Sequence, residues 1–162
     1  MTSRTQEPLK GSEENKFLQF EIDGEFYGVD ILKVREINGM MDITAVPQTP
    51  RFMKGLINLR GKVVPVIDLR LKFGLQESNY DERTSIIVIE FKSIHGQVQM
   101  GMVVDTVSEV VSLQGGHIEP PPNFGVRLKS EYILGMAKVK NRVIIILDID
   151  LILTDEDLTF GG

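Results

Sequence analysis

The stretch "NLRGKVVPVIDLR" (residues 58–70) has an apolar, β-branched centre between two charged ends. The centre, Val63–Ile67, is typical of a buried strand, because β-branched side chains pack well on a pleated sheet. Asp68 follows this strand and can cap a helical turn in the segment after it. At the other end, Arg60-Gly61 fits either a solvated hairpin turn or a recognition edge, and the rest of the chain is needed to choose between them.

The pattern of this stretch occurs a second time in the chain. Residues 55–73 ("GLINLRGKVVPVIDLRLKF") align with residues 135–153 ("GMAKVKNRVIIILDIDLIL"), and residues 28–37 align with residues 101–110. Two shifts of similar size in the same order predict two related halves of about 70–80 residues. A half of that size has a thin core, so the halves are expected to bury apolar surface against each other and to leave a groove at their joint.

The alignment of the halves separates shared from unshared residues. Asp68 matches Asp148, and both follow an apolar strand where a helical turn should begin, so both are predicted to be caps. Arg60-Gly61 is instead replaced by Lys140-Asn141. An arginine at a hairpin shoulder can be solvated, or it can brace a loop through its fork of donors. Because this end of the stretch fails to repeat, Arg60 is the stronger functional candidate.

A second candidate is the segment "KVREI" (residues 33–37). If it forms a strand or an edge, Val34 and Glu36 share one face. One apolar residue beside one acid is usual on a solvated edge. The matching pair, Val107 and Glu109, is explained by the common origin of the halves rather than by function.

Short β-rich runs with turn signals between them fill most of the chain. Residues 17–29 predict a hairpin with a two-residue Asp23-Gly24 turn. Residues 84–91 and 98–104 predict a second hairpin, and residues 141–149 predict another buried strand. Strands at this spacing indicate a mainly β fold of barrels or a sandwich.

Composition excludes several classes of function. The chain has 162 residues, a net charge of −5, no cysteine and no basic stripe, so disulfides, thiolate metal sites and nucleic-acid binding are not expected. No apolar run reaches the roughly 18–20 residues of a membrane span, and the N-terminus lacks the apolar core of a signal peptide. We predict an intracellular protein with a flexible tail at residues 1–15 and another tail at residues 154–162.

Motifs for catalysis, metals and cofactors are weak. His95 and His117 stand alone, outside any metal-binding pattern, and no phosphate-binding glycine motif or serine elbow is present. The pair Asp148 and Asp150 is the one support for an enzyme, and a cap is the better interpretation of Asp148. A small-molecule-binding barrel is a further alternative. We therefore predict no catalytic residue, no metal and no cofactor.

Four stretches in order resemble the CheW family of chemotaxis coupling proteins. They are "YGVDILKVREI" (27–37), "TPRFMKGLINLRGKVVPVIDLRLKFG" (49–74), "GMVVDTVSEVVSL" (101–113) and "EYILGMAKVKNRVIIILDIDLIL" (131–153). The resemblance runs from about Lys16 to Leu153. It implies an all-β fold of two packed five-stranded SH3-like barrels, with short helical turns and a short C-terminal helix. Together with the repeat, it predicts a CheW-like domain at 16–153 whose barrels cover roughly 16–82 and 83–153.

The resemblance also implies a function. The family is not enzymatic. Its members link the cytoplasmic tips of chemoreceptors to the regulatory domain of the histidine kinase CheA, in the cytoplasm at membrane-associated receptor arrays. An adaptor of a different chemosensory pathway is the nearest alternative, and this chain does not distinguish the two. Residues matching receptor-side positions of the family are Val34, Glu36, Gly55, Arg60, Gly101 and Val110. Of these, the glycines are expected to permit close backbone approach, and Arg60 is expected to be either a contact or a brace.

Overall fold

Strands dominate the computed structural model, which describes residues 15–94, 96–113, 118–120 and 130–153. The elements in chain order are β1 (Asn15–Ile22), β2 (Glu25–Asp30), the 3-10 turn η2 (Ile31–Lys33), β3 (Val34–Gly39), β4 (Met53–Leu59), β5 (Lys62–Asp68), α2 (Leu69–Lys72), β6 (Ser85–Ser93), β7 (Gly96–Val104), β8 (Thr106–Leu113), β9 (Ile118–Glu119), the 3-10 turn η4 (Ser130–Tyr132), β10 (Ile133–Val139), β11 (Arg142–Leu147) and α3 (Ile149–Ile152).

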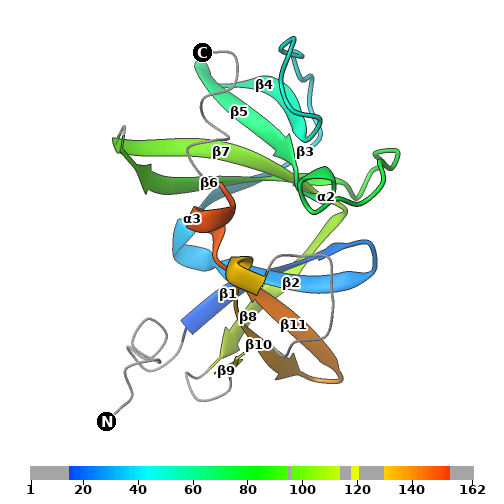
Figure 1. Ribbon diagram of the computed structural model, residues 1–162, viewed down its shortest axis with the longest axis vertical. Coiled ribbons are helices and arrows are strands. Elements are labelled where there is room, and N and C mark those ends of the chain that lie inside the picture. The colour runs from blue at the N-terminus through cyan, green and yellow to red at the C-terminus, as the bar shows by residue number, and fades with distance from the viewer. Residues whose placement is uncertain (1–14, 95, 114–117, 121–129, 154–162) are drawn as a thin grey trace.

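The strands form two sheets, one above the other in Figure 1. Sheet 1 has the order β3-β6-β7-β5-β4, and sheet 2 has the order β8-β1-β2-β11-β10-β9. The prediction of a mainly β fold with two packed units is confirmed. Sheet 2 exceeds the expected five strands because the two-residue strand β9 adds to β10.

The sheets do not follow the predicted division at residues 82 and 83. The hairpin β1–β2 pairs with β8 and β11 of the second half, and the hairpin β6–β7 pairs with β3 and β5 of the first half. The two related halves therefore exchange their first hairpins. A sequence repeat shows which segments are alike but not which sheet each hairpin joins, because a hairpin can pack the same apolar face in either sheet.

A large apolar cluster fills the joint between the sheets, as expected for two halves with thin cores. Its members include Leu18, Phe20, Tyr27 and Val29 from β1–β2, and Ile87, Ile89, Met100 and Met102 from β6–β7. The predicted register, with Leu18 opposite Val29 and Phe20 opposite Tyr27, is confirmed. Each sheet also encloses a smaller apolar cluster of its own.

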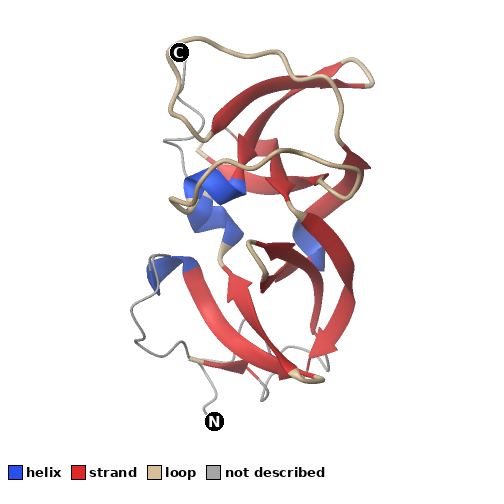
Figure 2. Cartoon of the chain, turned by 90° about the vertical axis from the view of Figure 1, so that its right-hand side faces the viewer, coloured by secondary structure: helices blue, strands red, loops and turns tan. Residues whose placement is uncertain are grey.

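The short helices α2 and α3 lie between the two sheets, where Figure 2 shows them in blue. Each begins at the predicted cap. The Leu71 N–H donates to Asp68 Oδ1 at 3.3 Å, and the Leu151 N–H donates to Asp148 Oδ1 at 3.2 Å. Both carboxylates therefore satisfy a backbone donor at a helix start.

A candidate binding surface around Glu36 and Arg60

Strand β3 forms one edge of sheet 1. Its pairing with β6 has a register shift between Val34 and Glu36, so the prediction that these two residues share a face is wrong. Glu36 and Asn38 lie on the face of Val88 and Ile86, whereas Val34 lies on the face of Ile89. Glu36 lies opposite Val88 of β6, and Val34 packs against the cluster at the joint. Glu36 therefore lies on the face of β3 that carries the smaller apolar cluster of sheet 1, and Val34 lies on the face at the joint.

The turn between β4 and β5 brings Arg60 to this acid. Arg60 has a φ of 52° and Gly61 a φ of 87°, the left-handed conformation of a tight hairpin turn. The Gly61 N–H donates to Asn58 Oδ1 at 2.7 Å, which fixes the turn. Arg60 Nη2 then donates to both carboxylate oxygens of Glu36, at 2.7 and 2.9 Å.

The ion pair is unequal in its exposure to solvent. The Arg60 side chain is 74% exposed, whereas that of Glu36 is 24% exposed. The hydrogen bond from Arg60 holds the pKa of the Glu36 carboxyl below its usual range, partial desolvation opposes this shift, and the Asn38 amide lowers the pKa further. The acid is therefore ionised at neutral pH, beneath a cation that solvent and partners can reach.

The two glycines of the predicted site lie in packed structure instead. Gly55 has a φ of 144°, and a Cβ there would stand 2.1 Å from the Thr44 carbonyl oxygen. A Cβ at Gly101 would stand 2.8 Å from Ile86 Cγ2. Because both positions are buried, a larger residue at either one would act on the packing of sheet 1.

Val110 comes from the other sheet. It lies on β8 opposite Leu18, and 49% of it is exposed. Leu18 belongs to the cluster against which Val34 also packs. The structure thus brings Glu36 and Arg60 into contact and puts the glycines inside sheet 1. Val34 packs at the joint, whereas Val110 reaches it only as the strand partner of Leu18.

A second polar network at the joint was missed by sequence reasoning. Arg70 on α2 donates to Asp105 Oδ2 at 2.7 Å, to Asp23 Oδ1 at 2.9 Å and to the Gln76 carbonyl oxygen at 2.7 Å. The Asp23 N–H also donates to Asp105 Oδ2 at 2.8 Å. Arg70 therefore ties sheet 1 to the β1–β2 turn of sheet 2.

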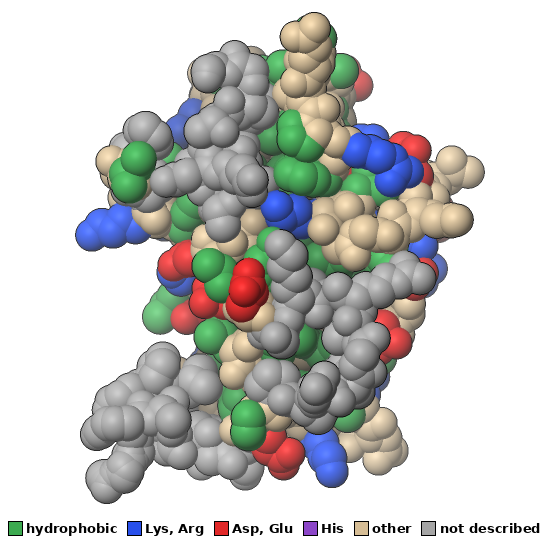
Figure 3. Space-filling view, viewed as in Figure 1, with side chains coloured by type: hydrophobic (Ala, Val, Ile, Leu, Met, Phe, Trp, Pro, Cys, Tyr) green, Lys and Arg blue, Asp and Glu red, His purple; other side chains and the backbone are tan. Residues whose placement is uncertain are grey.

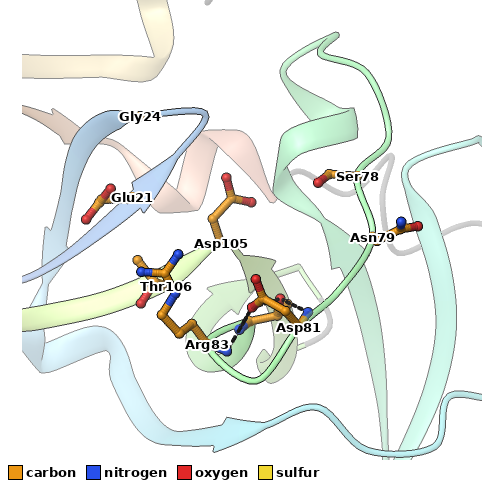
Figure 4. Close-up of a pocket in the computed structure, with 9 residues that line it drawn as sticks. Glu21, Gly24, Ser78, Asn79, Asp81, Arg83, Asp105 and Thr106 are labelled. Carbon is orange, nitrogen blue, oxygen red and sulfur yellow. Dashed lines mark hydrogen bonds between the residues drawn. The ribbon is translucent and has the colours of Figure 1, made fainter.

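A polar cavity of about 230 Å³ lies next to this network (Figure 4). Its lining includes Glu21, Asp81, Arg83, Thr84 and Asp105. The backbone amides of Arg83 and Thr84 donate to Asp81, which holds the pKa of that carboxyl below its usual range. Among the described residues, no group of three or more His, Cys, Asp or Glu side chains could hold a metal ion.

On the face drawn in Figure 3, the described acidic and basic side chains are interspersed. Within the described ranges, no helix has the length and apolar character needed to cross a membrane.

Comparison with known proteins gives a consistent result. The family model of the CheW-like domain matches residues 16–157. The chain is 46% identical over 143 residues to the chemotaxis protein CheW of Klebsiella aerogenes, covering 88% of this chain and 84% of that one. It is 33% identical over 147 residues to CheW of Thermotoga maritima, covering 88% and 89%. The crystal structure of the scaffolding protein TtCheW from Thermoanaerobacter tengcongensis superposes with a TM-score of 0.77 at 34% identity, covering 88% and 90%.

Proposed function

The chain belongs to the CheW-like domain family, and on that premise we propose that it is a non-enzymatic adaptor of chemotaxis signalling. It couples the cytoplasmic tips of chemoreceptors to the regulatory domain of the histidine kinase CheA. It acts in the cytoplasm, at membrane-associated receptor arrays. The names of its relatives, chemotaxis protein CheW and a scaffolding protein, support this role.

The observation that carries the receptor side of the proposal is the ion pair on the edge of sheet 1. Arg60 is a highly exposed cation held in place by the half-buried Glu36. A charged group at the rim of a contact sets register and association rate more than affinity. The exposure of Arg60 favours a contact with the receptor over a purely structural brace.

Apolar residues beside the joint supply the area for binding. Val34 packs on the joint cluster, and Val110 lies opposite Leu18 of that cluster on the other sheet. Ile37, which pairs with Ile87 of the cluster, is 44% exposed. Such a surface suits the apolar face of a helical receptor tip. Gly55 and Gly101 contribute indirectly, by allowing the packing that holds β4 and β7 in place. Weak contacts of this kind gain strength when repeated in an array.

The rival enzymatic interpretation loses its one support. Asp148 is an N-cap that accepts from the Leu151 N–H, and Asp150 forms an ion pair with Lys33 at 2.8 Å. Each carboxylate thus has a structural partner at α3. The pair does not need catalysis to explain it.

A binding experiment tests the function directly. The purified chain is offered a receptor signalling fragment and the CheA regulatory domain, first separately and then together. We expect each to be retained, and a ternary complex when both are present. Retention of neither partner contradicts the proposal. A kinase of another chemosensory pathway is offered in parallel, and retention of that kinase alone would assign the adaptor to that pathway.

Charge reversal at Glu36 tests the receptor surface. Glu36→Lys places two cations side by side and should weaken receptor binding by about tenfold, with little change in melting temperature. The matched control is Glu109→Lys in the second half, which should leave receptor binding unchanged. A large loss of stability in Glu36→Lys would show that Glu36 is buried and structural. An equal loss of binding in the control would show that this surface is not the receptor contact.

A further inference from the structure

The side chain of Asn38 carries a buried amide nitrogen. Its Nδ2 is shielded from solvent and has no hydrogen-bond partner among the described residues. Burying an amide donor without a partner is costly, and most buried donors in native proteins are paired. An unpaired donor therefore calls for an explanation in its surroundings.

Glu36 is the charged residue that lies beside Asn38 on the same face of β3. The two residues are two apart on β3, so their side chains share one face of the strand. The Asn38 amide is close enough to lower the pKa of the Glu36 carboxyl, although it does not meet the geometry of a hydrogen bond. Both oxygens of that carboxyl are already engaged by Arg60.

The second half of the chain lacks this arrangement. The position matching Asn38 is Val111, which is buried in the apolar cluster of sheet 2. A valine thus occupies the equivalent position of the strand in sheet 2, where it presents no unpaired donor. Only the half with the short Arg60–Glu36 bond carries an amide beside its glutamate.

We propose that Asn38 is a positioning residue that holds Glu36 when Arg60 leaves the ion pair. Arg60 can swing outward because its side chain is mostly in solvent. The half-buried carboxylate would then lose its donor, and the Asn38 amide, on the same face of β3, would donate to it in place of Arg60. A partner can thus engage the Arg60 guanidinium without leaving an unpaired acid in sheet 1. The proposal rests on the proposed function only for the identity of that partner.

The first test needs no partner. Arg60→Ala mimics the released state, and NMR follows the Asn38 side-chain amide protons together with the titration of Glu36. We expect the Asn38 amide protons to move downfield in Arg60→Ala. Adding Asn38→Val should then raise the proton affinity of Glu36 by about threefold or more. Unmoved amide protons, or the same Glu36 titration with and without Asn38, would overturn the proposal.

The second test uses the receptor signalling fragment. Asn38→Val should weaken receptor binding by about threefold to tenfold, while thermal stability holds or rises. Asn38→Ser keeps a donor and should recover part of the affinity. The matched control is Gln19→Val, because Gln19 is also a buried amide without a partner among the described residues but lies on β1 of sheet 2.

The outcomes of the two tests separate the two proposals. Full receptor binding by Asn38→Val, or an equal loss in Gln19→Val, would overturn the role of Asn38. If the unaltered chain fails to bind any receptor fragment, the proposed function fails, whereas the NMR result on Asn38 and Glu36 still decides the present proposal.

Discussion

Two arms of the chain share one sequence pattern and differ at their ends. The first arm comprises residues 53–72 (β4, β5 and α2), and the second comprises residues 133–152 (β10, β11 and α3). Their centres are alike: β5 runs parallel to β7 and β11 runs parallel to β2, each next to a glycine. Their hairpin turns are not. Arg60 lies 2.7 Å from Glu36, whereas Lys140 lies 3.6 Å from Glu109.

The helical ends of the arms also differ. Arg70 in α2 is only 17% exposed and bonds to three acceptors, two of them on sheet 2 or at its edge. The matching Asp150 in α3 makes one ion pair, with Lys33, and 45% of its side chain is exposed. The shared centre of the two arms therefore builds the fold. The first arm in addition carries the candidate binding surface and the stronger set of polar contacts between the sheets.

The largest expected effect is a loss of stability on substitution of a packed glycine, and it should be greater at Gly55 in the first arm than at Gly135 in the second. Gly55→Ala combines a left-handed φ with contact against the Thr44 backbone, and should lower the free energy of unfolding by about 4 kcal/mol. Gly135→Ala meets Ile118 Cγ2 at 2.6 Å and the Glu119 carbonyl oxygen at 2.7 Å without a left-handed φ, and should cost about 2 kcal/mol. Urea unfolding measures both. Equal losses would remove this difference between the arms.

The next largest difference in stability loss is expected between the two capping residues, Asp68 and Asp148. Asp68 is 2% exposed and also accepts from the Tyr80 hydroxyl at 2.7 Å, so Asp68→Ala leaves that hydroxyl without its partner. The expected loss is about 3 kcal/mol. Asp148→Ala removes only the bond to the Leu151 N–H and should cost about 1 kcal/mol. A loss at Asp148 as large as that at Asp68 would contradict the account of the caps.

The third difference in stability loss is expected between Arg70 and Asp150, which occupy matching positions in the two arms. Arg70→Leu leaves Asp23 and Asp105 close together without their cation, and we expect a loss of about 2 kcal/mol in urea unfolding. Asp150→Leu breaks the more exposed pair with Lys33 and should cost at most about 0.5 kcal/mol. If Arg70→Leu were as mild as Asp150→Leu, Arg70 would not be a clamp between the sheets.

The smallest effect is a dependence on pH. The pKa of Glu36 is lower in the folded chain than its ordinary value of 4.5, so its ion pair stabilises the fold above that pH. This contribution is lost as the pH falls through the lowered pKa. Arg60→Ala should flatten the acid limb of a stability curve, measured by urea unfolding between about pH 2 and 6. Lys140→Ala is the control, and a flattening of the same size there would contradict the assignment.

The local elements could be predicted from sequence because local chemistry determines them. The Asp23-Gly24 turn and the register around it follow from alternating apolar residues, and both residues take the expected left-handed conformation, with φ values of 55° and 80°. The caps at Asp68 and Asp148 follow from the repeat and from the preference of aspartate for helix starts. These features need no knowledge of distant pairing.

The long-range arrangement could not be predicted in the same way. Each hairpin could pair with strands of its own half or with strands of the other half. Both arrangements bury the same apolar faces, so the sequence pattern does not distinguish them. Arg70 bonds to residues 47 and 35 positions away, and no pattern in the sequence marks them. The contact of Glu36 with Arg60 left a signal only in the signs of the charges, because an acid and a base recur at the matching positions as Glu109 and Lys140 although Arg60-Gly61 itself is not repeated.

The most direct test of the central claim compares the two turns in a binding measurement. Arg60→Ala and Lys140→Ala are titrated with the receptor signalling fragment and with the CheA regulatory domain, and their unfolding is measured alongside. We expect Arg60→Ala to lose about tenfold or more in receptor affinity, to keep kinase affinity, and to lose less than about 1 kcal/mol of stability, while Lys140→Ala matches the unaltered chain. Joint loss of both partners with a large loss of stability in Arg60→Ala, or equal losses in the two variants, would contradict the claim that the Arg60 turn is the receptor contact.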